Sequence, residues 1–290
     1  MDIGIGLPNT VPGTTGEQLT EWAKRADDAG FSSLGTIDRI VYPNLEPMIA
    51  LAAAAAVTDR IRLATTILLA PTRISGAVLA KQAASVQKIS GGRMVLGVAV
   101  GGREEDYEVA GADFGSRGEN FERMLFEIRR TWSGSDESSG AAHHQGIGPD
   151  VSDPPPRLLV GGQIDAAFRR AAEFGDGWIA GGGTPDMFAG AKAKLDAAWS
   201  EAGRDGEPRT AALAYYALGD EAEAQANAYL KDYYAFLGDM ADQIAGGAAK
   251  DAQTAKGYVE AFEAVGCDEL IMFPTSSDPD QVDLLAEAVL

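Results

Sequence analysis

An acid and a guanidinium stand side by side in the segment Thr36-Ile37-Asp38-Arg39, at the end of a short apolar run. Such a pair can hydrogen-bond the edge of a polar ring, or stabilise negative charge that develops on a ligand. The two groups can equally pair with each other and with neighbouring charges, and taken alone the motif favours that structural role. Asp38 and Arg39 are therefore candidate catalytic residues that need support from other parts of the chain.

Two glycine turns indicate a second kind of chemistry, the binding of a phosphate. Gly161 and Gly162 separate an apolar run from a helical segment, and Gly181 and Gly182 do the same one run later. A glycine turn that leads into a helix offers bare backbone N–H groups and the positive end of the helix dipole. Glycines can also simply make tight turns. Two such turns after neighbouring runs make a phosphate site a serious alternative.

Several other chemistries are disfavoured by what the chain lacks. Its two histidines, His143 and His144, are adjacent and lie in one irregular stretch, so we expect no metal centre built from strand-end histidines. No lysine lies in or directly after the run at 177–183, which weakens a Schiff-base mechanism. Glu104 and Glu105 could be half of a glycosidase pair, but the later runs supply no obvious second carboxylate.

Eight short apolar runs alternate with segments of helical spacing. The stretch from Lys81 to Gly102 shows the pattern, because a helical face ends at Gly91 and Gly92 and the unbroken run Met94 to Val100 follows. A run of that kind is typical of a strand that is buried on both faces of a parallel sheet. The expected strands are Ile3 to Leu7, Ser33 to Ile37, Ile61 to Leu68, Met94 to Val100, Leu158 to Val160, Trp178 to Ala180, Thr210 to Leu218 and Leu270 to Phe273.

Eight such units predict a (β/α)8 TIM barrel of the α/β class, with an open doubly wound sheet as the alternative. In both folds ligands bind at the carboxyl ends of the strands, where Asp38 and the glycine turns stand. We expect one domain over residues 1–290, with a long loop around 133–156. The helices between 221 and 266 are expected to pack on the outside of the barrel.

Composition narrows the choice of partner and compartment. Forty-three acids against 24 bases give a net charge of -19, which argues against nucleic acid or an anionic membrane and leaves a small molecule as the expected partner. The single cysteine, Cys267, allows no intramolecular disulfide, and neither a signal-peptide pattern nor a membrane-length apolar run is present. We therefore expect a soluble, cytoplasmic protein.

Four segments, taken together, resemble the luciferase-like monooxygenase superfamily of flavin- and F420-dependent oxidoreductases. They are AGFSSLGTIDRI at 29–40, LEPMIALAAAAAVTDRIRLATTILLAPTR at 45–73, AKQAASVQKISGGRMVLGVAVGGREEDYEVAGADFGSRGENF at 80–121 and PPRLLVGGQIDAAFRRAAEFGDGWIAGG at 155–182. The ordered combination of AKQAA, SGGR, LGV, VGG and GDGW is specific, although each piece alone is weak.

The resemblance implies a TIM barrel that binds FMN or F420 at the carboxyl end of its strands. Asp38 is then similar to the acid that approaches the flavin ring, and a non-proline cis peptide is expected at or beside Thr66-Ile67, under that ring. The remaining residues that it implies for cofactor binding are Val100 and Gly101, along the ring or ribityl chain, and Gly161, Gly162, Gly181 and Gly182, around the phosphate.

The implied activity is transfer of a hydride, or of oxygen through a flavin peroxide, to a small organic substrate. Many family members have histidine after the second-strand acid, where this chain has Arg39, so Arg39 becomes the candidate for stabilising negative charge. The alternative is a flavin-binding protein without turnover. The short, arginine- and alanine-rich chain favours F420 slightly over FMN.

The resemblance also bears on partners and on local charge. It suggests a homodimer and a separate reductase that supplies reduced cofactor. The polyglutamate tail of F420 would be repelled at long range by the net charge of -19, but this repulsion is screened within about 10 Å. Arg103, Arg117 and Arg157 are expected as local counter-charges near the barrel mouth.

Overall fold

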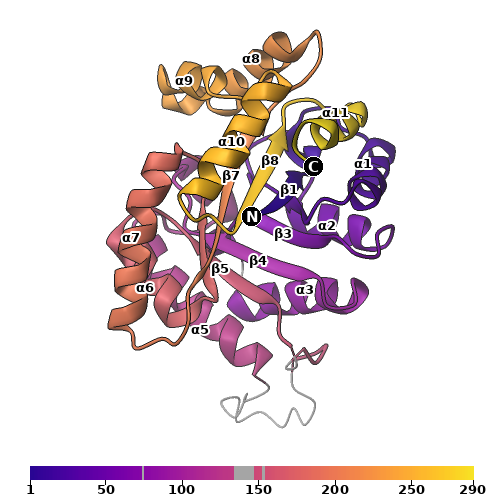
Figure 1. Ribbon diagram of the computed structural model, residues 1–290. Helices are drawn as coiled ribbons and strands as arrows, with labels where there is room; N and C mark the ends of the chain where they lie inside the picture. Colours follow the sequence, from indigo (N-terminus) through magenta and orange to yellow (C-terminus); the bar gives the residue numbers. More distant parts are fainter. Residues whose placement is uncertain (74, 134–146, 152–153) are drawn as a thin grey trace.

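Eight parallel strands close into a barrel in the order in which they occur along the chain (Figure 1). The computed structural model describes residues 1–73, 75–133, 147–151 and 154–290. The strands are β1 (Asp2–Gly6), β2 (Ser33–Thr36), β3 (Arg62–Leu69), β4 (Met94–Ala99), β5 (Arg157–Gly161), β6 (Gly177–Ala180), β7 (Arg209–Tyr216) and β8 (Glu269–Pro274).

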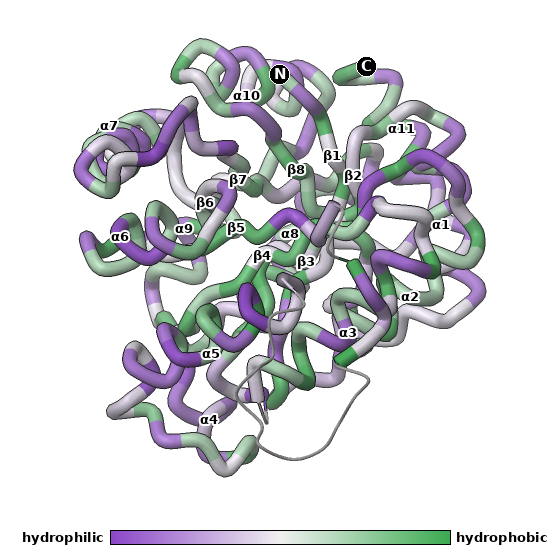
Figure 2. The backbone as a smooth tube through the Cα atoms, turned by 90° about the horizontal axis from the view of Figure 1, so that it is seen from below, coloured by the Kyte–Doolittle hydropathy of each residue, from purple (hydrophilic) through white to green (hydrophobic). Residues whose placement is uncertain are grey.

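Helices connect the strands and surround them. They are η1 (Pro8–Thr10), α1 (Gly16–Ala29), α2 (Pro47–Ala55), η2 (Ala70–Thr72), α3 (Gly76–Ile89), α4 (Glu104–Ala110), α5 (Arg117–Trp132), α6 (Asp165–Phe174), α7 (Pro185–Glu201), α8 (Ala222–Tyr233), η3 (Ala235–Leu237), α9 (Met240–Gly246), α10 (Ala252–Ala264) and α11 (Asp280–Val289). Figure 2 looks along the barrel, where largely hydrophobic strands lie inside a ring of helices that mix hydrophilic and hydrophobic residues.

The predicted (β/α)8 barrel is confirmed. Strands β1 and β8 pair directly, with Ile5 opposite Met272, so the sheet is closed and the doubly wound alternative is wrong. Every expected strand is found, with its ends within two residues of the expected ones. The agreement has a simple cause, since strands buried on both faces leave continuous apolar runs in the sequence.

An irregularity in β3 shapes the carboxyl end of the barrel. The pairing of β3 with β4 shifts between Thr65 and Leu68, and the Thr66–Ile67 peptide within this shift is cis, as the resemblance predicted. The Thr65 hydroxyl donates to Gly97 O at 2.7 Å and accepts from Gly97 N at 2.9 Å, so a side chain bridges the two strands there. Residue 97 is glycine because a Cβ would lie 2.2 Å from Thr65 O.

The segment after β7 departs from expectation. Helix α10 joins the outer layer, but the expectation that all helices between 221 and 266 pack outside the barrel is wrong for α8 and η3. The rings of Tyr229 and Tyr233 from α8 pack in one buried cluster with Tyr215 and Phe273 from the strands. Figure 1 shows α8 and α9 together at one end of the molecule, apart from the ring of outer helices. The end of α8 therefore forms a roof over the carboxyl end of the barrel.

The expected long loop at 133–156 falls largely outside the described residues, as do His143 and His144. Within the residues that the structure describes, no helix is both long enough and apolar enough to cross a membrane.

Candidate active site

A hollow of about 210 Å³, here called the mouth hollow, lies at the carboxyl end of the barrel. Its walls come from β2, β3 and β7, from the turns after β4 and β6, and from the α8–η3 roof. The lining residues are Ile37, Asp38, Thr66, Ile67, Leu69, Gly102, Arg103, Gly181, Leu213, Tyr215, Tyr233, Tyr234 and Phe236. Segments far apart in the sequence therefore meet at the place where the sequence predicted a ligand.

Asp38 is buried at the edge of the mouth hollow, with 3% of its surface exposed. Its Oδ2 accepts hydrogen bonds from Leu69 N at 2.9 Å and from Arg73 Nη2 at 2.7 Å. Burial raises the pKa of the Asp38 carboxyl, while the neighbouring Arg73 opposes that rise. Both of these hydrogen bonds go to Oδ2, so Oδ1 is the oxygen with remaining capacity to accept from a ligand.

Arg39 does not pair with Asp38. Its guanidinium forms an ion pair with Glu105, donates to Tyr233 O at 3.1 Å and lies 4.9 Å from the Tyr42 ring centroid. Arg39 is not among the residues that line the mouth hollow, although it contacts the roof. In this conformation Arg39 joins the loop after β2 to α8 and to α4. Arg73, which forms the ion pair with Asp38, was not predicted from the sequence.

The Ile67 side chain reaches toward both glycine turns. A Cβ on Gly161 would lie 2.6 Å from Ile67 Cδ1, and a Cβ on Gly181 would lie 3.5 Å from the same atom. Ile67 therefore forms an apolar floor between these two turns. Gly101 is equally confined, because its φ is +74° and a Cβ would lie 2.6 Å from Leu69 Cδ2.

The two glycine turns have the backbone that a phosphate site needs. Gly162 has φ of +127° and Gly182 has φ of +116°, values that side-chain-bearing residues rarely adopt. Helix α6 follows Gly162 without a side-chain cap on its first N–H groups, whereas Thr184 caps α7 by accepting from Met187 N. The uncapped start of α6 leaves donors for an anion, so these residues fit a cofactor phosphate.

Trp178 fixes the first of these turns. Its Nε1 donates to Gly162 O at 2.7 Å, and its ring packs 5.7 Å from that of Phe168 in α6, centroid to centroid. The carbonyl of Gly162 is thereby occupied, while the backbone around it stays available to a ligand. The GDGW motif in the sequence thus places a tryptophan whose role is to hold the turn.

The roof was not foreseen from the sequence. Tyr215 and Tyr234 share a hydrogen bond of 2.8 Å between their hydroxyls, and burial raises the pKa of both. Tyr233 is 1% exposed, its pKa is also raised by burial, and its hydroxyl has no partner among the described residues. These phenols therefore stay protonated and can donate hydrogen bonds. Only the unusual density of tyrosine at 229–234 could have drawn attention to them.

The sequence-predicted residues divide into two sets. Asp38, Thr66, Ile67 and Gly181 line the mouth hollow, and Gly161, Gly162, Gly182, Val100 and Gly101 lie in the strand-end turns around it. Of the three expected counter-charges, Arg103 lines the hollow, while Arg117 begins α5 and lies over the ring of Phe114. The expectation for Arg157 is wrong, because it is the first residue of β5 and lies at the opposite, amino end of the barrel.

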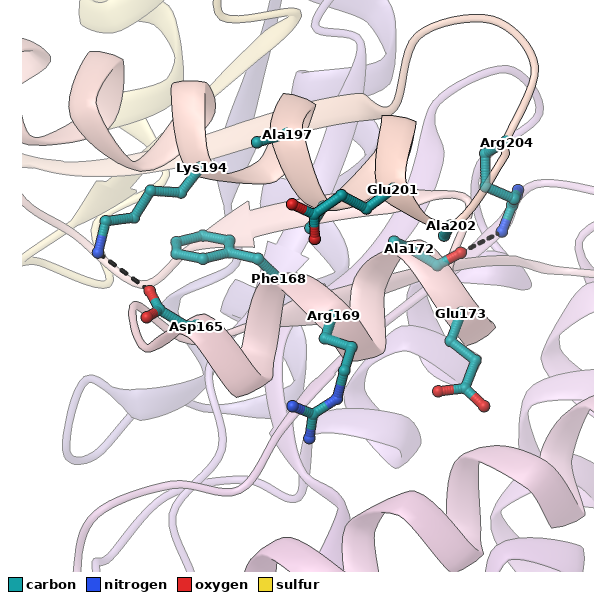
Figure 3. Close-up of a pocket in the computed structure, with 11 residues that line it drawn as sticks. Asp165, Phe168, Arg169, Ala172, Glu173, Lys194, Ala197, Glu201, Ala202 and Arg204 are labelled. Atoms are coloured by element: carbon teal, nitrogen blue, oxygen red, sulfur yellow. Dashed lines mark hydrogen bonds and ion pairs between the residues drawn. The ribbon is translucent and has the colours of Figure 1, made fainter.

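A larger groove of about 850 Å³ runs between α6 and α7 on the outside of the barrel (Figure 3). Two of its cations have partners, since Lys194 Nζ bonds Asp165 Oδ1 at 3.0 Å and Arg204 donates to Ala172 O at 2.7 Å. None of its lining residues is among those that the sequence identified as candidates for chemistry. Size alone therefore does not identify the site, and the mouth hollow is the better candidate.

Comparison with known proteins agrees with this architecture. A sequence model of the family described as luciferase-like monooxygenase matches residues 1–283. An uncharacterized protein of Mycobacterium tuberculosis H37Rv is 34% identical over 208 residues, which is 63% of this chain and 71% of that protein.

Two solved structures share the fold over almost the whole chain. An F420-dependent secondary alcohol dehydrogenase, in complex with an F420-acetone adduct, has a TM-score of 0.83 at 18% identity and covers 99% of this chain and 98% of its own. The oxygenating constituent of 3,6-diketocamphane monooxygenase of Pseudomonas putida, in complex with FMN, has a TM-score of 0.70 at 18% identity and covers 100% and 98%. Because the family model spans residues 1–283 of 290, the chain belongs to the luciferase-like monooxygenase family of flavin- and F420-dependent oxidoreductases.

Proposed function

We propose that the protein is an oxidoreductase that binds a reduced flavin-type cofactor in the mouth hollow, with F420 preferred over FMN, and transfers a hydride to a small organic substrate. One observation carries the proposal. Asp38 and Gly181 follow β2 and β6, and Ile67 lies near the end of β3, yet all three line one hollow, with the second glycine turn at Gly161 beside them.

Each group has a physical role in this scheme. The backbone N–H groups after Gly161 and Gly162 hold the phosphate, with the uncapped start of α6 behind them. The Ile67 side chain supports a flat ring between the two glycine turns. Asp38, fixed by Arg73 and Leu69 N, presents Oδ1 as an acceptor at the ring edge. When bound, the reduced cofactor supplies the hydride, and the aromatic roof excludes water from it.

The preference for F420 rests on the length and composition of the chain. The short, arginine- and alanine-rich sequence resembles the F420-using branch of the family. Proteins of this fold are known with F420 and with FMN, and those two likenesses leave the choice open. A deazaflavin lacks the N5 through which flavins react readily with oxygen, so F420 use implies hydride transfer without oxygenation.

Substrate-dependent consumption of reduced cofactor tests the activity. Under anaerobic conditions, reduced F420 and reduced FMN are each incubated with the protein and with a panel of small ketones, aldehydes and conjugated carbonyl compounds. The proposal expects F420 oxidation that requires both protein and a panel member. Tight cofactor binding without turnover on any member supports a flavin-binding protein instead.

The proposal extends to the assembly and its setting. We expect a homodimer in the cytoplasm that receives reduced cofactor from a separate reductase. Sedimentation of the purified protein tests the first part, since a single species at the monomer mass of 30.3 kDa contradicts it.

A further inference from the structure

Arg103 is a cation at the mouth without an acidic partner. Arg39 pairs with Glu105 and Arg73 pairs with Asp38, but in the part of the chain that the structure describes Arg103 forms no ion pair. Its guanidinium is held instead by rings of the roof, 4.9 Å from the Tyr233 centroid and 4.2 Å from that of Phe236. Its position therefore calls for a ligand anion.

Two donors beside this hollow lack acceptors. Within the described residues, neither Arg103 Nε nor the Tyr233 hydroxyl has a hydrogen-bond partner, and both atoms are buried. Leaving a buried donor unsatisfied is destabilising, and natural structures seldom leave such a group without a partner. Both residues line the same hollow, and one of them carries a full positive charge. An anionic oxygen would satisfy both groups.

Arg103 and Tyr233 lie on a different side of the hollow from the proposed cofactor contacts. The residues assigned to the cofactor, Ile67 and the glycine turns, lie at the strand ends that form the floor. Arg103 and Tyr233 face the hollow from the roof side, together with Phe236 and Tyr234. A flat ring that lies on Ile67 leaves these roof groups available for the molecule that reacts with it.

We propose that Arg103 and Tyr233 bind the substrate, and that the substrate carries a carboxylate on an apolar or aromatic body. This inference rests on the proposed function, because it takes the floor of the hollow as the cofactor side. The rings of Tyr234 and Phe236 with the side chains of Ile37 and Leu213 provide the apolar surface, and the Arg103 fork provides the carboxylate contact.

Benzoate and its neutral counterpart benzamide are suitable probes. Calorimetric titration of the full chain, alone and with F420 or FMN added, is expected to show benzoate binding at least about tenfold tighter than benzamide binding. Arg103→Met should remove this preference, Arg103→Lys should keep part of it, and Tyr233→Phe should weaken benzoate binding several-fold. Arg117→Met is the matched control, since Arg117 also lies over a ring but outside the hollow.

Three results would overturn the inference. The first is that the wild type binds benzoate no more tightly than benzamide. The second is that Arg103→Met binds benzoate as tightly as the wild type does. The third is that Arg103→Met loses cofactor affinity while its benzoate affinity stays intact. The last result assigns the arginine to the cofactor. Because benzoate is also titrated without cofactor, a failure of the flavin proposal shows separately, as an absence of F420 and FMN binding. Circular dichroism verifies that each variant is folded.

Discussion

Asp38 and Arg73 form a direct ion pair at the carboxyl end of the barrel, with 2.7 Å between Oδ2 and Nη2, although 35 residues separate them in the sequence. Only 2% of the Asp38 side chain and 21% of the Arg73 side chain are exposed. Despite this partner, burial raises the pKa of Asp38 above its usual 3.8. The site therefore contains a carboxyl group whose ionisation costs free energy in the folded state.

This leads to a prediction for stability against pH. The folded protein keeps a proton on Asp38 at pH values where the unfolded chain has lost it, so the stability of the wild type falls as pH rises from 3.8 through the raised pKa. Asp38→Asn removes this contribution. Urea unfolding of both proteins between pH 4 and pH 8 should show the wild type losing stability relative to the variant as pH rises.

Parallel pH profiles for the two proteins would contradict this prediction. Asp205→Asn is the matched control, because Asp205 is exposed and lies in the turn after α7. The free energy of unfolding of Asp205→Asn should change with pH in the same way as that of the wild type.

A second prediction concerns the amino end of the barrel, where Glu269 is buried. Burial alone would raise its pKa, but Arg62 and a hydrogen bond from Ser32 at 2.6 Å bring it below the usual 4.5. Glu269→Gln should lower the free energy of unfolding by about 2 kcal/mol at neutral pH, because Arg62 loses a charged hydrogen-bond partner and keeps only Asp2 among the described residues. The difference should shrink as pH falls through the lowered pKa of Glu269. Urea unfolding measures both effects.

Cofactor affinity shows whether Glu269 affects only stability or also the candidate active site. Glu269→Gln should leave it unchanged, since the amino end of the barrel lies opposite the mouth. Glu263→Gln is the control, because Glu263 also bonds a cation, the N-terminus, but is 59% exposed. A loss of stability in Glu263→Gln as large as that in Glu269→Gln would show that burial is not the deciding factor.

The contrast between these two ends shows what the sequence could predict. Strand positions were predictable because each buried strand is an apolar run, and the meeting of Asp38, Ile67 and Gly181 followed from the rule that strand ends share one edge. The position of Arg157 was also predictable, since it precedes its strand's apolar residues, and the expectation that it lies at the mouth was an error of interpretation.

Other features depend on packing that no local pattern encodes. Arg73 comes after η2 and forms ion pairs with both Asp38 and Glu46, which come from two other segments of the chain. The roof depends on α8 folding back so that Tyr233 contacts Arg39 and Tyr42, which the alanine- and acid-rich sequence of that helix does not reveal. The ligand contact that Tyr233 offers from the roof therefore became visible only in the structure.

A third prediction tests the phosphate turn. Gly162→Val places a Cβ about 2.8 Å from the Ala167 Cβ and puts a β-branched residue at φ of +127°, so the turn must move. The affinity for FMN or F420 should fall at least about tenfold if backbone N–H groups there hold the phosphate. Fluorescence titration measures the affinity, and circular dichroism monitors the fold.

Gly206→Val provides the comparison for this variant. Gly206 also has positive φ, +71°, but a Cβ there meets no atom within 4 Å and the residue lies in the turn between α7 and β7. It should lose some stability and retain full cofactor affinity. Equal affinity losses in both variants would mean that strain, and not phosphate binding, explains the effect.

Equilibrium binding of F420 and FMN to the purified protein tests the central claim most directly. The claim is that the mouth hollow holds a flavin-type cofactor, with F420 preferred. Titration at several salt concentrations should give an F420 dissociation constant on the order of micromolar and a weaker one for FMN. Micromolar affinity for FMN with none for F420 would contradict the preference and restore oxygenation as the reaction, and absence of binding by either cofactor would contradict the claim itself.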